Sequence, residues 1–317
     1  MTARGLDVLS LGEALVDLLP DRRGRLRDCD SFTPHSGGAP SNVAVGCARL
    51  GLRTGFAGVL GDDEFGRLLE RKLLGEGIRT HLRFTKDAPT GCWFIALDEN
   101  GNRSFFSPSG PGSADKLVSV DDVRQAPIAD ANFLHCGSSS HVRPEAREAL
   151  HVALSLAREA GTQTSFDPNV RPHLWKDPRE LRAMCLRAFP LCDVVKLSDE
   201  ESEAALGEAD PHRALSALAD LGVGLACVTL GPKGAIAQRG ADRFEIAAPK
   251  VEVVDTTGAG DGFVAGLLSL IAGQEAPRVR DLPRETLEAA LHRACAVGSR
   301  VCTRLGAVGG PPFAQDL

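Results

Sequence analysis

Apolar residues follow two alternating patterns along most of the chain. Short continuous apolar runs of strand length occupy residues 7–12, 133–136, 164–166, 194–197 and 225–230. Elsewhere, apolar residues recur at helical spacing over residues 39–50, 62–74, 143–160, 178–189, 199–206 and 211–221. Strands that alternate with helices in this way predict an α/β fold with a mainly parallel sheet and helices on both of its faces.

Two regions break this alternation with short strand-like segments and turn residues. They lie within roughly residues 15–36 and 90–108, and the turn chemistry of residues 99–102 makes the second region a predicted hairpin. We interpret both regions as one small β-sheet inserted into a single domain that spans residues 1–317. A sheet beside a ligand cleft is typical of a lid, whereas the simpler alternative is an edge extension of the main sheet.

Composition narrows the class of protein. The 317 residues carry a formal net charge of −6, with 25% charged and 43% hydrophobic residues, the usual balance of a globular protein. The acidic balance argues against nucleic-acid binding, and no stretch approaches the 18 consecutive apolar residues of a membrane span. The N-terminal residues lack the pattern of a signal peptide. Nine cysteines, none in a CxxC pair, are typical of the reducing cytoplasm.

The most informative segment is VDTTGAGDGFVAG at residues 254–266. It predicts the end of a strand, a tight turn of small residues and then a helix. Exposed amides of Gly258, Ala259 and Gly260, with the partial positive charge of a helix N-terminus, form an anion site suited to a phosphate in transit. Asp261 is then predicted to accept a proton from a hydroxyl that attacks phosphorus, as a weak base because of the helix dipole. The alternative is a turn with an ordinary Asp helix cap.

A second glycine cluster opens the helix predicted at residues 39–50. Gly37 and Gly38 would let a ligand approach the backbone, and Asn42 offers both a donor and an acceptor, which suits a polyhydroxyl ligand. Asp17, which follows the first strand, can accept two hydroxyl hydrogen bonds at once. On the other interpretation, Asn42 is a helix cap and Asp17 is an ordinary surface acid.

Two further loops combine phosphate chemistry with a simpler alternative. Gly231, Lys233 and Gly234 form a turn like those that contact phosphate, although a strand–turn–strand hairpin uses the same residue types. The acids that follow Ser198 and end at Glu201 could hold Mg²⁺ through water. An N-cap followed by acids that favour the helix dipole explains these acids about as well.

The two glycine-rich segments, one near each end of the chain, carry a family resemblance. Gly37, Gly38 and Asn42, followed by DTTGAGD at residues 255–261, resemble the ribokinase-like sugar kinases of the PfkB type over nearly the whole chain. Within that family, the segments most similar to fructokinases are residues 12–17, 38–44, 166–171 and 197–201. The resemblance implies a doubly wound α/β core with a β-sheet lid, which agrees with the hydrophobic pattern.

The resemblance also assigns roles to single residues. It implies that Asp261 is the base, that residues 258–260 are the anion hole, and that the sugar contacts Asp17, Gly38 and Asn42. Glu201 matches a residue tied to Mg²⁺ and phosphate. The resemblance implies that the nucleotide is bound by Ser198, Thr229, Gly231 and Gly234. Ser198 replaces an Asn of the family motif. Asp255 and Thr257 match a monovalent-cation site. Cys295 stands where relatives often carry an Asn near adenine, so that pocket is expected to be altered.

We therefore expect a cytoplasmic kinase that uses ATP and Mg²⁺, with K⁺ as a further cofactor, to phosphorylate the primary hydroxyl of fructose. The same fold with 2-keto-3-deoxygluconate, ribose or a nucleoside as acceptor stays open, since Arg171 could serve a carboxylated acceptor. A non-catalytic sugar- or nucleotide-binding regulatory relative is the alternative from another class. The expected partners are the sugar and ATP, without a nucleic acid or a membrane, and a second copy in a homodimer through the lid. Its apolar face would be supplied by Trp93, Phe94, Phe105 and Phe106.

Overall fold

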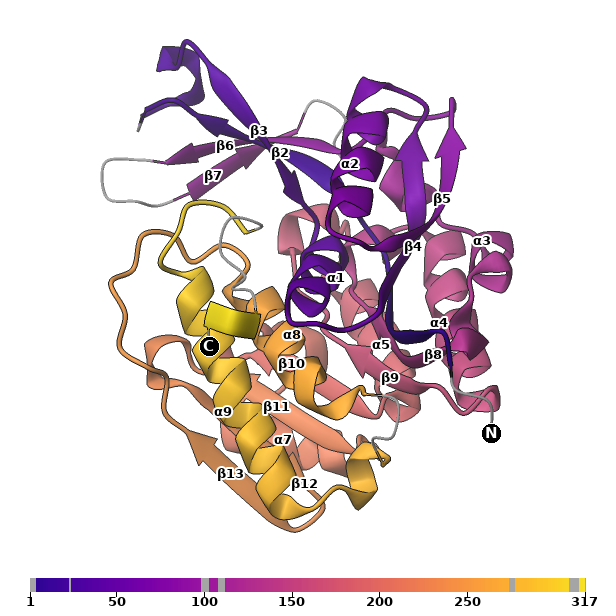
Figure 1. Ribbon diagram of the computed structural model, residues 1–317, viewed down its shortest axis with the longest axis vertical. Helices are drawn as coiled ribbons and strands as arrows, with labels where there is room; N and C mark the ends of the chain where they lie inside the picture. The colour runs from indigo at the N-terminus through magenta and orange to yellow at the C-terminus, as the bar shows by residue number, and fades with distance from the viewer. Residues whose placement is uncertain are drawn as a thin grey trace.

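A nine-stranded sheet forms the centre of the protein (Figure 1). The computed structural model describes residues 4–22, 24–97, 103–107, 112–273, 277–307 and 314–316. Along the sheet the strands follow the order β13 (Asp242–Ile246), β12 (Ala235–Arg239), β11 (Leu225–Thr229), β10 (Val194–Ser198), β9 (Gln163–Phe166), β8 (Ala131–Cys136), β1 (Leu6–Leu11), β4 (Thr54–Gly61) and β5 (Arg79–Thr85). Neighbours pair in parallel except β11 with β12 and β12 with β13. The predicted mainly parallel sheet is confirmed.

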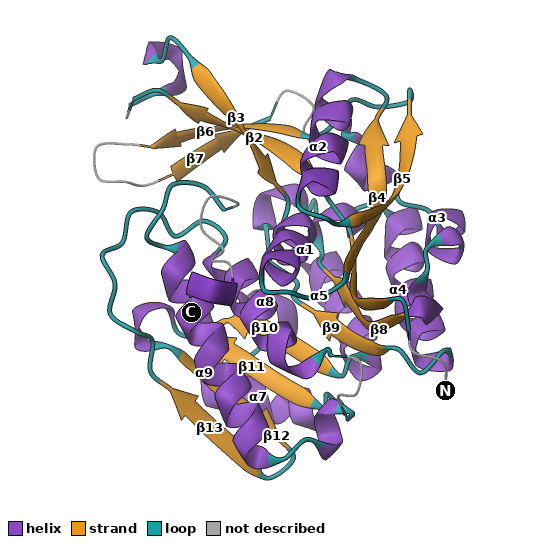
Figure 2. Ribbon diagram, in the orientation of Figure 1, coloured by secondary structure: helices purple, strands orange, loops and turns teal. Residues whose placement is uncertain are grey.

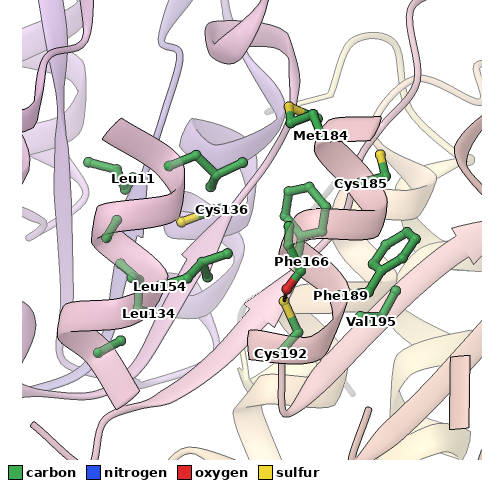
Figure 3. Packing of buried hydrophobic residues seen from close by; sticks show 14 of the residues in the cluster. Leu11, Leu134, Cys136, Leu154, Phe166, Met184, Cys185, Phe189, Cys192 and Val195 are labelled. Carbon is green, nitrogen blue, oxygen red and sulfur yellow. Dashed lines mark hydrogen bonds between the residues drawn. The ribbon is translucent and has the colours of Figure 1, made fainter. Parts of the chain in front are cut away.

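Helices cover both faces of this sheet (Figure 2). One core contains residues from α3 (Val120–Gln125), α4 (Pro144–Glu159), α5 (Pro178–Ala188), α6 (Asp199–Leu206) and α7 (Pro211–Asp220). The other contains residues from α1 (Ala39–Arg49), α8 (Ala259–Ile271) and α9 (Arg284–Val301), and α2 (Glu64–Gly75) packs beside α1. Successive strand residues such as Val8 and Leu9 enter opposite cores, as the two-residue period of a strand requires. Figure 3 shows the first core, where Leu134 and Phe166 pack with Leu154.

Capping residues explain where the predicted helices begin. The helix expected from residue 62 starts two residues later because the Asp63 side chain caps it, accepting a hydrogen bond from the Gly66 amide at 2.8 Å. Helices α4, α5 and α7 each start at a proline, a residue favoured in the first turn. The helix predicted at 199–206 has the same bounds in the structure.

The order of the strands places a ligand site at one edge of the sheet. From β1 the chain runs outward to β4 and β5, then returns to β8 on the other side of β1 and continues to β9, β10 and β11. Ligands of open α/β sheets bind beyond the carboxyl ends of the strands where the strand order reverses. The strand order therefore predicts a ligand site beyond the ends of β1, β8 and β9.

The two regions with short strands form a separate sheet, the lid sheet, in the order β3 (Phe32–Gly37), β2 (Leu15–Pro20), β6 (Cys92–Leu97) and β7 (Arg103–Phe106). It projects beyond one edge of the main sheet (Figure 1). The alternative of an edge extension is wrong, because β2 follows β1 after only three residues and pairs with β3 and β6 instead. Strands β6 and β7 form the predicted hairpin, whose turn at residues 99–102 lies outside the described residues.

Three of the aromatic residues proposed for one apolar lid face, Trp93, Phe94 and Phe106, do not share a face. Trp93 lines the cavity described below, whereas the neighbouring Phe94 packs edge-to-face against Phe32, with ring centroids 5.1 Å apart. Phe94 also lies 6.3 Å from the ring of Phe106, its register partner, which is 56% exposed. Phe105 is paired in register with Ile95 instead. Alternation along the strands thus leaves Phe94 and Phe106 on the outer face.

Two expectations from composition concern membranes and cysteines. In the part of the chain that the structure describes, every helix is too short or too polar to cross a membrane. All nine cysteines fall within the described residues, and each is a free thiol. Seven of them are buried, as expected of small apolar side chains in a core.

Candidate active site

A cavity of about 550 Å³ lies beyond the carboxyl ends of the central strands. Its walls come from the segments that follow β1, β8, β9, β10 and β11, from the start of α1 and of α8, and from the lid sheet. The lining residues include Glu13, Asp17, Gly38, Asn42, Trp93, Lys116, Asn169, Arg171, Lys196, Ser198, Glu200, Glu201, Thr229, Thr257, Gly258, Ala259, Gly260 and Asp261. Most of the predicted site residues therefore meet in one place.

The segment before α8 is not a strand, contrary to the prediction. Strand β13 ends at Ile246, and residues 247–258 connect it to α8 without forming a strand or a helix. Val254, which is 56% exposed, and Asp255 donate their amides to the carbonyl of Cys302 at the end of α9. The apolar residues before the turn suggested a strand, but this segment crosses to a helix end and has no strand beside it.

Asp255 holds the turn that leads into α8. Its Oδ1 accepts hydrogen bonds from the amide and the hydroxyl of Thr257, both at 2.8 Å, and its Oδ2 accepts one from the Gly306 amide at 2.9 Å. The carboxylate is 5% exposed. The monovalent-cation role of Asp255 and Thr257 stays a prediction.

Small residues are required where α8 begins. Gly258, the N-cap, has φ 78°, a left-handed conformation that favours glycine, and a Cβ there would lie 2.7 Å from the side chain of Ala307. A Cβ on Gly260 would lie 2.9 Å from Nζ of Lys196. Together with Ala259 they line the cavity at the positive end of a 13-residue helix. The Ala259 amide donates to the Thr256 carbonyl at 3.2 Å, so an anion would be bound by the helix N-terminus and the other amides of this segment.

Asp261 is buried beside this turn, with 8% of its surface exposed. Its Oδ2 accepts a hydrogen bond from Nδ2 of Asn42 at 2.8 Å, so α1 and α8 meet at this pair. Burial raises the pKa of Asp261 to about 7, helped by Asp167 and opposed by Asn42, Lys196 and Arg171. The expectation of a weak base was therefore wrong, because loss of water outweighs the helix dipole.

Asn42 is not a helix cap, since α1 begins at Ala39 with Gly38 as its N-cap. The Oδ1 atom of Asn42 is buried and has no hydrogen-bond partner among the described residues. A buried acceptor without a partner is costly, so a ligand hydroxyl that donates to it would be favoured. Asn42 thus offers an acceptor to the cavity while its amide group holds the carboxylate of Asp261.

The two glycines before α1, Gly37 and Gly38, are required by close packing within the protein. A Cβ on Gly37 would collide with the carboxylate of Asp17, and one on Gly38 would collide with the carbonyl of Glu13. Gly37 is absent from the cavity wall, whereas Gly38 and the half-buried Asp17 belong to it. Gly37 therefore lets β3 and β2 bring Asp17 close to the start of α1.

Sequence reasoning missed a buried ion cluster under the anion site. Lys196, at 5% exposure in β10, lies 3.0 Å from Oδ2 of Asp167 and 3.7 Å from Oε2 of Glu201. Burial alone would lower the pKa of Lys196, but the two carboxylates raise it above its usual value, and Lys196 carries a full positive charge. A lysine inside an apolar strand was the signal that could have identified this site.

Ser198 and Glu201 form a capping box at the start of α6. The Ser198 hydroxyl accepts from the Glu201 amide at 3.2 Å, and Glu201 Oε2 accepts from the Ser198 amide at 2.8 Å. Its Oε1 accepts from the Val170 amide at 2.7 Å. Although burial alone would raise it, the pKa of Glu201 stays below its usual value because of Lys196 and these bonds. The capping interpretation is confirmed, and a water-mediated Mg²⁺ role is compatible with it.

The predicted nucleotide residues are divided between the cavity and its surroundings. Thr229 lines the cavity, and Gly231 and Lys233 lie in the exposed connection between β11 and β12, which is a hairpin. A Cβ on Gly234 would collide with the carbonyl of Ile246, so this glycine serves strand packing. Cys295 is 5% exposed within the core between α8 and α9. Contacts of these residues with a nucleotide stay predictions.

Arg171 follows β9 and is exposed at the cavity wall. Its Nη1 donates to the carbonyls of Asn169 and Val170, at 3.3 and 3.1 Å. Asn169 has φ 45°, and its amide donates to Asp167 Oδ1 at 3.0 Å. A non-glycine residue in the left-handed region is uncommon, and such strain often marks functional sites.

Known carbohydrate kinases are similar to this chain over nearly its whole length. Residues 6–313 match the description "pfkB family carbohydrate kinase". The chain belongs to the pfkB family of carbohydrate kinases. Among curated members of the family, the fructokinase of Klebsiella pneumoniae is 38% identical over 309 residues, which cover 97% of this chain and 96% of that protein. The predicted resemblance and the assignment as a phosphotransferase with an alcohol acceptor are confirmed.

Solved structures of family members have the same fold. A fructokinase from Xylella fastidiosa with bound ATP superimposes with a TM-score of 0.88 at 33% identity, covering 98% of this chain and 96% of that one. A double mutant of a fructokinase from Vibrio cholerae, solved with fructose, ADP and a potassium ion, gives a TM-score of 0.86 at 33% identity, covering 98% and 97%. The doubly wound, ribokinase-like fold with a small separate sheet is thereby confirmed.

Proposed function

We propose that this family member is an ATP-dependent fructokinase that transfers the γ-phosphoryl group of ATP to the 6-hydroxyl of fructose. The observation that carries the proposal is the meeting of Asp261, buried and with a raised pKa, with an amide-lined helix N-terminus in a polar cavity. The fructokinases listed above, one solved with ATP and another with fructose and ADP, support this choice of substrates.

Asp261 acts as the general base. A carboxylate with a pKa of about 7 is half ionised at neutral pH, so it accepts a proton readily and is still available in its charged form. The 6-hydroxyl gives this proton to Asp261 as its oxygen bonds to the γ-phosphorus, and the bond from that phosphorus to the bridging oxygen of ADP breaks. Asn42 fixes the carboxylate through its Nδ2 atom.

The turn at residues 258–260 receives the transferring group. Its amides lie at the positive end of α8, next to the base, where negative charge develops on the phosphoryl oxygens. Lys196 lies directly under Gly260 and balances Asp167 and Glu201, so the site does not present three uncompensated carboxylates to the phosphate. The chain contributes position and charge, which is what phosphoryl transfer needs from a protein.

Mg²⁺ belongs to the proposal as a companion of the nucleotide. Among the described residues, no group of three His, Cys, Asp or Glu side chains is arranged to hold a metal ion. Both oxygens of Glu201 already accept amide bonds, so this residue and the cavity-lining Glu200 would meet the ion through water. Such a site fits Mg²⁺, which usually keeps several waters and binds substrate phosphates. The ion would supply charge neutralisation on those phosphates.

The acceptor lies between the core and the lid sheet. Asp17 of β2 accepts sugar hydroxyl bonds, and Trp93 of β6 forms part of the same wall. Closure of the lid sheet over the sugar would exclude water, which favours transfer to the sugar over hydrolysis of ATP.

Three further properties follow from this proposal. Asp255 and Thr257 hold a monovalent cation behind the anion site, in line with the potassium ion of the Vibrio cholerae fructokinase structure. The protein works in the cytoplasm, where free thiols persist. A homodimer forms through the outer lid face with Phe94 and the exposed Phe106.

The acceptor is tested by a panel of sugars with ATP, with ADP release as the readout. We expect the highest kcat/KM for fructose, ahead of ribose, 2-keto-3-deoxygluconate and a nucleoside. A higher kcat/KM for any of these would replace fructose as the acceptor and leave the kinase assignment intact. Absence of ADP release with every acceptor would favour a non-catalytic relative instead.

A further inference from the structure

A second buried ion pair lies at the cavity, remote in sequence from the base and the anion turn. Asp115 and Lys116 are neighbours in a 3-10 turn (Ala114–Leu117), with 1% and 2% of their surfaces exposed. Nζ of Lys116 donates to Oδ2 of Asp115, and Lys116 lines the cavity. The proposed mechanism makes no use of this pair.

The pair sits where the lid sheet leaves the core. Gly91 directly precedes β6, its carbonyl accepts the Val16 amide of β2, and a Cβ added to it would lie 2.9 Å from Oδ1 of Asp115. That Oδ1 atom has no hydrogen-bond partner among the described residues. Asp115 is thus enclosed against the base of the lid sheet.

The ammonium group of Lys116 does not use all of its N–H donors among the described residues. An ammonium group carries three N–H donors, and within the described part of the chain its hydrogen bond is to Asp115. Burying a lysine is costly unless its charge is paired and its donors are used. Because Lys116 lines the cavity, oxygen atoms of a bound acceptor can take the remaining donors.

The other charges nearby are negative. Glu13 follows β1, is 2% exposed and accepts the Ser140 hydroxyl at 2.7 Å, and both Glu13 and Asp17 line the cavity with Lys116. Arg171 also lines the cavity, but its Nη1 donates to the carbonyl of Val170, whose amide donates to Glu201, so this cation lies towards Glu201. The part of the cavity wall that carries Glu13, Asp17 and Lys116, here called the acceptor wall, thus presents two acids and one ammonium group. The partner of this ammonium group, Asp115, does not itself line the cavity.

We infer that Asp115 determines the acceptor class by cancelling the charge of Lys116. Paired in this way, Lys116 donates hydrogen bonds to the hydroxyl oxygens of an uncharged polyol but does not retain a carboxylate, which the neighbouring acids repel. The sugar acid 2-keto-3-deoxygluconate carries its carboxylate on C1, at the opposite end from its C6 hydroxyl. With that hydroxyl at Asp261, the carboxylate lies away from the reaction centre, on the acceptor wall. This inference rests on the proposed function and explains why the enzyme would select an uncharged sugar over a sugar acid.

The direct test is Asp115→Asn, which keeps the shape of the side chain and removes its charge. The readout is kcat/KM for 2-keto-3-deoxygluconate divided by kcat/KM for fructose, with the KM for ATP measured alongside. We expect this ratio to rise about tenfold or more, the effect of one charge-assisted hydrogen bond, with the KM for ATP unchanged. A purely structural role would lower both values together.

Asp122→Asn is the matched control. Asp122 pairs with Arg83 at 2.6 Å, and Arg83 also donates to the carbonyl of Leu117 in the same 3-10 turn, yet neither side chain lines the cavity. This variant disturbs the segment without changing the charge of the acceptor wall. The acceptor ratio should stay within about twofold of the wild type.

Lys116→Met supplies a second measurement that holds even if Asp115→Asn does not fold. It leaves Asp115 without its counter-charge and removes the donors, so kcat/KM for fructose should fall about tenfold or more while the KM for ATP is kept. An unchanged acceptor ratio in Asp115→Asn, or an unchanged kcat/KM for fructose in Lys116→Met, overturns this inference and leaves the fructokinase proposal standing. A wild-type enzyme that phosphorylates neither sugar overturns that proposal, and the inference with it.

Discussion

The two ends of the cavity are built from different parts of the protein. The phosphoryl end consists of core elements: backbone amides at the start of α8, the carboxylate of Asp261 and a buried counter-charge from Lys196. The acceptor end consists of side chains where the core meets the lid sheet, such as Asp17 and Lys116. On the proposed function, phosphoryl transfer depends on backbone and buried groups of the core, whereas the choice of sugar depends on a few side chains that single substitutions can change.

The largest expected effect lies at the phosphoryl end. Asp261→Asn keeps the hydrogen bond with Asn42 but removes the base, so kcat should fall by about 10²- to 10⁴-fold with the sugar affinity largely kept. Steady-state kinetics and sugar binding by calorimetry check this split. Activity within about threefold of the wild type would remove Asp261 from the role of base.

Removing the counter-charge below the anion site should mainly reduce stability. Lys196→Met leaves Asp167 and Glu201 buried without their cation, so the free energy of unfolding should drop by about 3–5 kcal/mol. The control is Arg187→Met, which breaks an exposed pair with Glu148 and should cost less than about 1 kcal/mol. Denaturant unfolding measures the free energy of unfolding of both variants. Equal losses in the two would show that the buried pair contributes no more to stability than the exposed one.

At the acceptor end, Asp17→Ala should affect the sugar and not the nucleotide. Hydrogen bonds to a charged group contribute about 1.5–3 kcal/mol, so kcat/KM for fructose should fall roughly 10- to 150-fold. The KM for ATP should change little. If both Michaelis constants rise equally, a folding defect or a displaced lid sheet is the better explanation, and no change in either makes Asp17 an ordinary surface acid.

The pH profile tests the environment of the base. Burial raises the pKa of Asp261 from 3.8 to about 7, and only the ionised carboxylate accepts a proton. Thus kcat/KM for fructose should be level above pH 7 and fall about tenfold per unit as the pH drops below it. The residual activity of Asp261→Asn should lack this inflection. An inflection near 4 would show that burial does not control this carboxylate.

The smallest expected effect concerns the cation behind the anion site. Replacing a bulky organic cation by K⁺ should raise activity a few-fold, because an ion beside Asp255 would hold the turn into α8 in position. Assays in potassium and tetramethylammonium salts at equal ionic strength measure this. Identical kinetics in both salts would leave Asp255 as a structural cap of Thr257 and Gly306.

The sequence predicted the fold well because the relevant signals are local. Strands and helices follow from apolar spacing and caps. The anion site follows from small residues at the start of a helix, with Gly258 as the N-cap and Ala259 and Gly260 as the first helical residues. The failures are equally physical. The segment around Val254 has strand-like residues but meets the end of α9. Trp93 lies on a different face of the lid sheet from Phe94 and Phe106 because strand residues alternate.

The partners of the buried charged groups could not be predicted from the sequence, because most of them come from other segments of the chain. Lys196 meets Asp167 from a neighbouring strand, and Asp261 meets Asn42 across 219 positions. The raised pKa of Asp261 also depends on burial, which the helix dipole argument omitted. Lys116 next to Asp115 was visible in the sequence, but nothing local indicated that the pair is buried at a cavity.

The central claim is transfer of a phosphoryl group to the sugar hydroxyl held at Asp261. Its most direct measurement is to incubate the wild-type enzyme with fructose, ATP and Mg²⁺ and to locate the phosphate on the product by phosphorus and carbon NMR. The account predicts fructose 6-phosphate in amounts equal to the ADP released. Phosphate on another carbon, or ADP and inorganic phosphate without a sugar phosphate, would contradict it.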